Sequence, residues 1–262
     1  MHAITVNYPT DWENARLYIM SDLHIGDPNT NMADIHSQIE QIKNDPNGLF
    51  ILNGDLINAA VRNSVSDIYS EGASPMEQLQ MAIDLFSPIK EKLIGATSGN
   101  HEDRIWKNDG IDVTKFICAQ LKADDKYDPD GLLIFLRFGR RDPHGVHKKA
   151  NPRVTYTIYM SHGRGGGRKE GAKAIRLADM ASIVDADVYI HSHTHLPMAM
   201  VESYYRAHES SRSVEMVDKL FVNAASSVNY GGYSQKNEYK PSAMRHPVIS
   251  LAGSKKFARA IL

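Results

Sequence analysis

Five short apolar runs of this chain each end in a cluster of aspartate, asparagine or histidine residues. Runs of this length that are rich in β-branched and aromatic residues are typical of buried strands. They lie at residues 16–20, 48–52, 93–97, 154–160 and 187–191. Because α/β sheets gather ligand-binding groups in the loops at the carboxyl ends of strands, the pattern predicts one site assembled from several strand ends.

Helical patterns separate the first three of these strands. Apolar residues recur at spacings of three and four between residues 32 and 42, which indicates one face of a helix and therefore a β-α-β unit. Residues 74–77 read Ser-Pro-Met-Glu, which combines an N-cap serine, a proline at the first helical position and a capping-box glutamate. This segment predicts a helix that continues through Phe86. Further helices are expected around residues 113–121 and 172–184.

The second half of the chain is richer in strands. Residues 132–138 and 154–160 flank a polar segment, and together they predict a long hairpin. Later strand-like runs lie at residues 197–205, 213–225 and 246–252. We find no internal repeat and no linker, and a length of 262 residues is compatible with one two-sheet domain. A single domain over residues 1–262 is therefore expected.

The overall composition limits the function classes. Thirty Lys and Arg against 31 Asp and Glu give a formal net charge of −1, so no global basic field indicates nucleic-acid binding. The single cysteine, Cys118, excludes an internal disulfide, and the N-terminal residues lack the basic-then-apolar pattern of a secretory signal. No stretch approaches the roughly 20 apolar residues of a membrane-spanning helix. We expect a cytoplasmic protein with no membrane partner, and the oligomeric state stays open.

A locally basic segment runs from the end of the first arm of the predicted hairpin to the start of the second, over residues 137–153. It contains a single acid, Asp142, and its basic side chains are Arg137, Arg140, Arg141, Lys148, Lys149 and Arg153, with His144 and His147. Such a segment can guide a polyanionic substrate, so nucleotides and nucleic acids stay among the candidate substrates. Few aromatic residues interleave with these charges, and we therefore favour an ordinary charged hairpin.

The polar clusters themselves offer carboxylate, imidazole and amide groups. In chain order they are Asp22-x-His24, Gly54-Asp55, Gly99-Asn100-His101-Glu102, His162 and His193-x-His195. Donors of these kinds suit divalent ions such as Mn, Fe, Zn or Ni, and the lack of cysteine in the clusters argues against a thiolate zinc site. Each cluster alone is a weak indication, because a lone histidine is more often a structural residue than a ligand.

In this order, the clusters resemble the signature of the calcineurin-like metallophosphoesterase superfamily, D-x-H, G-D, G-N-H-[DE], H, G-H-x-H. The resemblance extends over roughly residues 16 to 197. It implies an α/β fold, namely a four-layer αββα sandwich of two mixed β-sheets flanked by helices. It also implies a dinuclear metal-dependent hydrolase of phosphoester bonds, with phosphodiesters favoured as substrates.

The resemblance further implies a role for each matching residue. The first metal ion is expected on Asp22, His24 and His195, the second on Asn100, His162 and His193, and Asp55 is expected to contact both. The cofactors would be two divalent ions, with Mn favoured for activity, and a water shared between them would attack phosphorus in line with the leaving oxygen. His101 would protonate that leaving oxygen or stabilise charge on the phosphoryl group.

Two residues depart from the family pattern. Ser192 stands where a glycine is usual, so the turn before His193 must tolerate a β-carbon. Asn58 stands where many relatives carry an aspartate, which in some phosphatases orients the catalytic histidine. Its replacement weakens an interpretation as a protein phosphatase.

Substrate contacts are expected from arginines near the clusters. Arg104 follows the third cluster, and a guanidinium group matches phosphate oxygens in a bidentate manner. The glycine-rich segment 163–171 lacks the pattern of a nucleotide P-loop. It is expected to let the backbone pass close to the metals, and Arg164 or Arg168 is a candidate to face the substrate. Solvent-exposed arginines without a role in binding are the alternative for all three.

Two other functions stay open. A nuclease is supported by the basic hairpin alone, and a non-catalytic binding scaffold with the same fold is opposed by the complete set of ligands and His101. The tyrosine- and glycine-rich segment 228–240, together with the His-Ser-His-Thr-His run, resembles bacteriophage or prophage members of the superfamily. This last resemblance identifies no substrate.

Overall fold

The computed structural model describes residues 1–61, 64, 68–141, 153–165 and 167–262. Within them, the strands form two mixed sheets. The six-stranded sheet contains, in spatial order, β1 (His2–Asn7), β5 (Leu132–Phe138), β6 (Val154–Met160), β7 (Val188–His191), β9 (Ser213–Asn223) and β8 (Met198–His208). The five-stranded sheet contains β11 (Ala258–Ile261), β10 (Val248–Ala252), β2 (Asn14–Met20), β3 (Gly48–Asn53) and β4 (Leu93–Thr97).

The two sheets pack face to face and bury an apolar core between them. Strand β5 alternates buried and half-buried side chains, as expected of a strand with one face on a core. Every residue of β3 is buried, because this strand has the inter-sheet core on one face and helices on the other. The core between the sheets includes Leu17, Ile51, Ile134, Ile158 and Val222.

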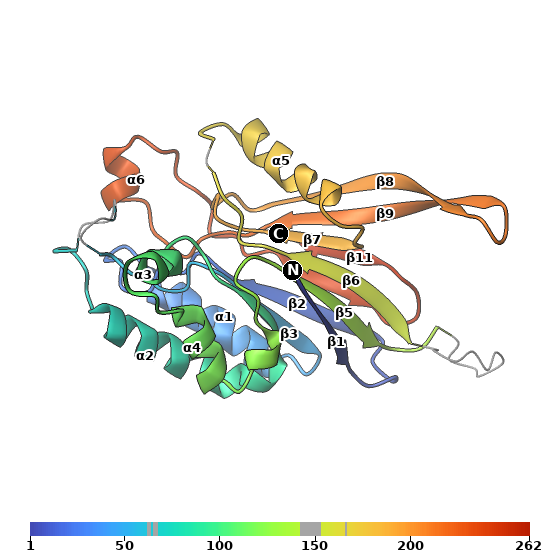
Figure 1. Cartoon of the computed structure of the whole chain (residues 1–262), viewed down its shortest axis with the longest axis horizontal. Coiled ribbons are helices and arrows are strands. Elements are labelled where there is room, and N and C mark those ends of the chain that lie inside the picture. Colours follow the sequence, from blue (N-terminus) through green and yellow to red (C-terminus); the bar gives the residue numbers. More distant parts are fainter. Residues whose placement is uncertain (62–63, 65–67, 142–152, 166) are drawn as a thin grey trace.

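Helices cover the outer faces of both sheets (Figure 1). The outer face of the five-stranded sheet carries α1 (Met32–Asn44), α2 (Pro75–Phe86), α3 (Glu102–Asp109) and α4 (Val113–Gln120). The six-stranded sheet is covered by α5 (Glu170–Asp179), whose Leu177 packs against Tyr189 and Phe221. This arrangement confirms the four-layer αββα sandwich that the resemblance implied.

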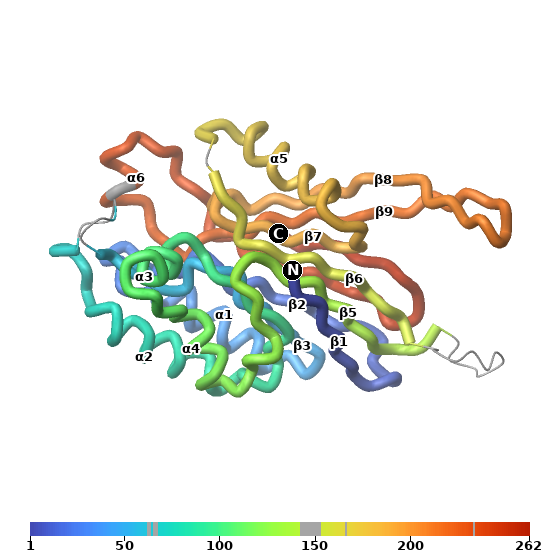
Figure 2. The backbone as a smooth tube through the Cα atoms, viewed as in Figure 1, coloured from blue at the N-terminus to red at the C-terminus, as the bar shows by residue number. Residues whose placement is uncertain are grey.

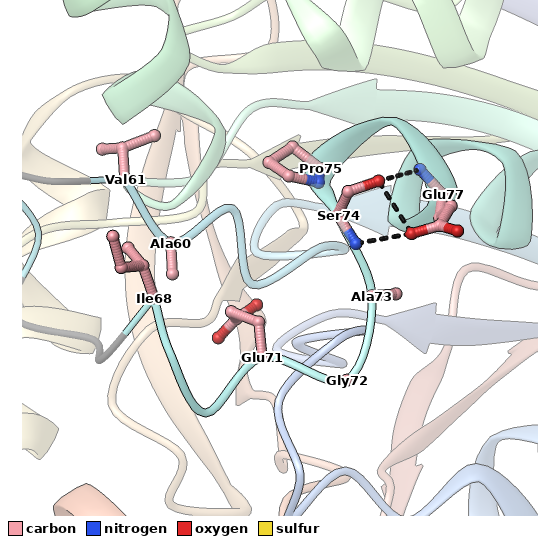
Figure 3. Close-up of a pocket in the computed structure, with 9 residues that line it drawn as sticks. All are labelled: Ala60, Val61, Ile68, Glu71, Gly72, Ala73, Ser74, Pro75 and Glu77. Atoms are coloured by element: carbon pink, nitrogen blue, oxygen red, sulfur yellow. Dashed lines mark hydrogen bonds between the residues drawn. The ribbon is translucent and has the colours of Figure 1, made fainter.

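Local sequence signals explain where several helices begin. Helix α2 starts at the predicted capping box, in which Ser74 Oγ accepts from the Glu77 N–H and Glu77 Oε2 accepts from the Ser74 N–H at 2.8 Å (Figure 3). Helix α1 is capped by Asn31, whose side chain accepts from the Asp34 N–H at 3.1 Å. Helix α5 begins two residues before the predicted range and ends at Asp179, where a 3-10 turn, η3 (Met180–Ser182), follows.

Several elements have no counterpart among the predicted ones. Strand β1 pairs in parallel with β5, and β11 pairs with β10, but both are short edge strands with half-exposed patterns. Helix α3 starts inside the third polar cluster, and the 3-10 helices η1 (Ser87–Lys92) and η2 (Asp124–Lys126) are also new.

The predicted hairpin is described in part. Its arms are antiparallel, as β5 and β6, whereas residues 142–152 between them, including Lys148 and Lys149, lie outside the described residues. A second hairpin, β8 with β9, was predicted only as two separate strands, and it is a long arm that extends beyond the rest of the sheet (Figure 2). It runs three residues past the predicted end of its first strand, to His208.

Candidate metal centre

The candidate site lies at the carboxyl ends of parallel strands from both sheets. Strands β2, β3 and β4 run parallel, and the loops that follow them carry Asp22, Asp55 and Asn100. In the opposing sheet, β6 and β7 run parallel and are followed by His162 and His193. Since parallel strands end at the same edge of a sheet and the two sheets face each other, these loops converge.

One group of side chains gathers around Asp22. Its Oδ1 lies 3.2 Å from His195 Nε2, and His24 Nε2 lies 3.2 Å from the same nitrogen. The ligand atoms of the three residues all lie within 4.8 Å of one another. Burial acts to raise the pKa of Asp22, but His195 holds this pKa below its usual value. The group thus offers a carboxylate and two imidazoles to a divalent cation.

A second group gathers around Asp55. Its Oδ2 lies 3.2 Å from His162 Nε2, and the ring centroids of His162 and His193 are 5.4 Å apart. The ligand atoms of these three residues also lie within 4.8 Å of one another. Asp55 forms a further group of this kind with His24 and His101. Asp55 therefore lies between the two halves of the site.

Two buried atoms of the site fit a cation. Asn100 Oδ1 has no hydrogen-bond partner among the described residues, and His162 Nε2, although 3.2 Å from Asp55 Oδ2, makes no hydrogen bond of good geometry either. The Nδ1 of His162 donates to the carbonyl oxygen of Asn53 at 2.7 Å, so in the neutral imidazole Nε2 carries the lone pair. Buried polar atoms without a partner are rare unless an ion or a water completes them. Both atoms are suitable ligands for a divalent metal.

The pKa values of two histidines of the site are shifted in opposite directions. Burial acts to lower the pKa of His162, but Asp55 raises it to about 10. Burial lowers the pKa of His193 to about 4. Because a ligand must be deprotonated to bind a metal, His193 is ready for binding at neutral pH, whereas His162 must first release a proton.

The backbone is left-handed at five residues of the site. These are Asp22, His24, Asp55, His193 and His195, with φ of 51°, 50°, 52°, 66° and 54°. Non-glycine residues rarely adopt this region, although Asp and His do so more often than most. Such conformations persist only where the surrounding structure holds them, and they concentrate at functional sites.

Glu102 holds two of these loops together. Its side chain is buried, and its oxygens accept from the N–H groups of Asp55 at 2.9 Å, Leu56 at 2.6 Å, Ile57 at 3.1 Å and Gly99 at 2.9 Å. Burial, with the nearby Asp55 charge, raises the pKa of Glu102 to about 7, whereas its four N–H donors favour the carboxylate. From sequence, Glu102 was only the last letter of a motif, and its supporting role was missed.

Two glycines let these loops approach each other closely. A β-carbon on Gly99 would lie 2.2 Å from the backbone nitrogen of Asp55, and one on Gly54 would lie 2.7 Å from the α-carbon of Gly99. Neither position has room for a side chain. The two glycines therefore set the spacing between Asp55 and Asn100.

His101 points its two ring nitrogens in different directions. Its Nδ1 donates to the carbonyl oxygen of Asn58 at 2.7 Å. Its Nε2 lies 3.9 Å from Asp55 Oδ2 and 3.0 Å from Arg104 Nη2. Burial is the main cause of its lowered pKa, and the charge on Arg104 acts in the same direction. Arg104 is thus placed beside His101, as its proposed contact with substrate requires.

The two arginines of the glycine-rich segment lie farther out. Arg164 is 79% exposed, and its Nη2 lies 3.6 Å from a carboxylate oxygen of Asp103 in α3. Arg168 donates to the carbonyl oxygen of Asn237 at 3.2 Å and stacks over the ring of Tyr239. The segment 228–240 therefore contacts the glycine-rich segment.

The serine that departs from the family pattern has a structural partner. Ser192 is buried, and its Oγ accepts from Asn53 Nδ2 at 2.6 Å. Its φ is not among the positive values, so a β-carbon is tolerated there. His191 forms a 2.8 Å hydrogen bond with Asn223 Oδ1.

Comparison with known proteins identifies the class to which this fold and site belong. The model of the calcineurin-like phosphoesterase family matches residues 15–197. The chain belongs to this family, and it is a metal-dependent phosphoesterase. Family membership and the His/Asp groups both support divalent metal binding. No curated protein matches the chain.

Three solved structures are similar over most of their length. A conserved uncharacterised protein of Streptococcus pneumoniae TIGR4, a predicted phosphoesterase, is 12% identical with a TM-score of 0.38, covering 95% of this chain and 97% of that one. A single mutant of Vps29 from Entamoeba histolytica is 11% identical with a TM-score of 0.42, covering 94% and 98%. A metallophosphoesterase from Sphaerobacter thermophilus is 12% identical with a TM-score of 0.35, covering 90% and 83%. These TM-scores add nothing to the family assignment.

Membrane insertion through a helix has no support in the described part of the chain. No helix there is both long enough and apolar enough to span a bilayer.

Proposed function

We propose that this chain is a phosphodiesterase that works with two divalent ions. The ligands would be Asp22, His24 and His195 for one ion, Asn100, His162 and His193 for the other, and Asp55 for both. The observation that carries this proposal is the position of Asp55, which belongs to a group with His162 and His193 and to another with His24. When bound, the ions would neutralise phosphoryl oxygens and supply an activated water. Mn suits this mixture of carboxylate, amide and imidazole donors.

His101 is proposed to act on the leaving oxygen. Because its Nδ1 donates to a carbonyl oxygen, the remaining proton of the imidazolium form is carried on Nε2, which faces Asp55 and Arg104. Without substrate, Arg104 and burial favour the neutral ring. An anionic phosphoester bound beside Arg104 would add negative charge near Nε2 and favour the protonated ring. His101 could then deliver this proton to the leaving oxygen.

A diester is proposed as substrate because the residue at position 58, Asn58, cannot supply the carboxylate that orients the catalytic histidine in some protein phosphatases. The Asn58 side chain bonds to Glu71, and only its backbone carbonyl contacts His101. In this chain a backbone carbonyl oxygen therefore takes the place of the aspartate that orients the histidine in some protein phosphatases. Arg104 and Arg164 are proposed to bind the substrate phosphate.

Metal counting and hydrolysis test this proposal. Protein purified with excess Mn should contain two ions per chain by elemental analysis, and it should hydrolyse phosphodiesters faster than phosphomonoesters. Metal binding without turnover on either class would support a scaffold instead. One ion or none would contradict the dinuclear centre.

The role of His101 has its own measurement. His101→Gln should keep both ions and lower kcat on an alkyl phosphodiester by ~10²- to 10⁴-fold, the usual range for general acid catalysis. The loss should be smaller for p-nitrophenyl esters, because p-nitrophenolate leaves without a proton. His36→Gln, an exposed histidine on α1, is the matched control and should change neither rate. Equal losses on both substrates would contradict an acid role.

A further inference from the structure

The peptide group between Asn58 and Ala59 determines how His101 is oriented. Its carbonyl oxygen accepts from His101 Nδ1 at 2.7 Å, and its N–H donates to Gln78 Oε1 at 2.9 Å. Because a peptide group is planar, fixing its N–H also fixes the direction of its carbonyl. Ala59 has a φ of 48°, a strained value for alanine, so this turn must be held in place by its surroundings.

Glu71 joins the two side chains that hold this peptide. Its Oε1 accepts from Asn58 Nδ2 at 2.6 Å, and its Oε2 accepts from Gln78 Nε2 at 2.6 Å. Gln78 and Asn58 are buried, so neither amide exchanges this bond readily for water. Figure 3 shows Glu71 between Ala60 and the start of α2, on the wall of a surface pocket.

We propose that Glu71 is a positioning residue for His101 and acts through Gln78 and the Asn58 peptide. This inference rests on the proposed role of His101 at the leaving oxygen. Position 58 lacks a carboxylate, and Glu71, 13 residues along the chain, provides one that contacts the Asn58 and Gln78 side chains instead of His101 itself. It sets the ring indirectly, by fixing the carbonyl to which Nδ1 donates, and so directs Nε2 towards the site.

The chemistry of the bridge suggests a reciprocal test. Both partners of Glu71 are amide N–H donors, so both of its oxygens must accept. Glu71→Ala removes both acceptors, and Asn58→Asp places two carboxylates in contact. Each single change therefore breaks the bridge, whereas in Glu71→Gln alone the Asn58 amide could turn over and accept. The double variant N58D/E71Q exchanges donor and acceptor and restores two bonds.

Kinetics on an alkyl phosphodiester measure the effect. Each single variant should lower kcat roughly 10- to 100-fold, the range typical of outer partners of site residues, with KM and metal content unchanged. The loss should be smaller on p-nitrophenyl esters. The double variant should recover to within a few-fold of the original. Glu77→Gln, which makes at the exposed cap of α2 the change that the double variant makes at residue 71, should leave the rate unchanged, since glutamine also completes a capping box.

A spectroscopic readout separates this inference from the role of His101. The hydrogen-bonded Nδ1–H of His101 should give a protected proton resonance that is lost in Glu71→Ala and returns in the double variant. If Glu71→Ala leaves both this resonance and the leaving-group dependence intact, Glu71 does not position His101, whatever His101→Gln shows. If the single variants fail to fold, a double variant that folds but stays impaired overturns the inference equally.

Discussion

Replacing Glu102 by glutamine should destabilise the protein strongly, although the change alters one atom. Each carboxylate oxygen accepts two backbone N–H groups in a buried environment. Glutamine keeps one oxygen and turns an NH₂ group towards the other pair of donors. Two buried N–H groups then lose their acceptor, and each such loss costs about 1–3 kcal/mol. The free energy of unfolding should therefore fall by roughly 2–6 kcal/mol, a large part of the total of about 5–15 kcal/mol that is usual for a domain.

Urea unfolding of the metal-free protein measures this loss. The metal must be removed first, because a ligand that binds only the folded state adds to the apparent stability. The midpoint should fall while the dependence on urea keeps its slope, as for a change in stability alone. Glu40→Gln is the control, since Glu40 pairs with Lys43 on the surface and such pairs contribute under about 1 kcal/mol. A loss below about 1 kcal/mol for Glu102→Gln would refute the assigned bonding.

Two further outcomes are expected at the metal centre. Asp55→Ala should lose both ions, because the proposed bridge contributes to each, and elemental analysis that finds one ion still bound at its original affinity would contradict the sharing. Metal binding at pH 7.5 should release about one proton from His162, beside any proton that a metal-bound water loses, because Asp55 raises the pKa of His162 to about 10 and a ligand nitrogen must be unprotonated. Calorimetry in buffers of different ionisation enthalpy measures the total release, from which the His162 proton should fade as the pH rises through 10 and be missing in His162→Gln.

The parts of the fold with strong periodicity were predictable from sequence. The buried strands that precede Asp22 and Asp55, and the capping box at Ser74, follow from local residue patterns. Strand β1 could not be found in this way, because it joins its sheet by pairing with β5, which lies far along the chain. Strand β11 pairs with the adjacent β10, but its four residues, none of them buried, are too few to indicate a strand. The two-sheet architecture came from the family resemblance, and the order of the strands was not predicted, since periodicity says nothing about which strands are neighbours.

The candidate site was predictable to the extent that it is carried by residue types. Carboxylates and imidazoles at strand ends indicate metal binding even when each motif is weak. Glu102 and Glu71 could not be recognised, because their partners are backbone N–H groups and amides whose positions depend on the fold. A carboxylate that accepts such bonds has the same letter in the sequence as one exposed to solvent.

Substitution by glycine would affect the stability of this centre differently from its chemistry. At Asp22, His24, Asp55, His193 and His195, φ lies between 50° and 66°, where a β-carbon is disfavoured by about 1–3 kcal/mol. Glycine adopts this region without that penalty. A descendant no longer selected for hydrolysis would therefore gain folding stability by accepting glycine at the very positions that are proposed to hold the metals. Five side chains kept in such a backbone mark a chain whose chemistry is retained at the expense of its stability.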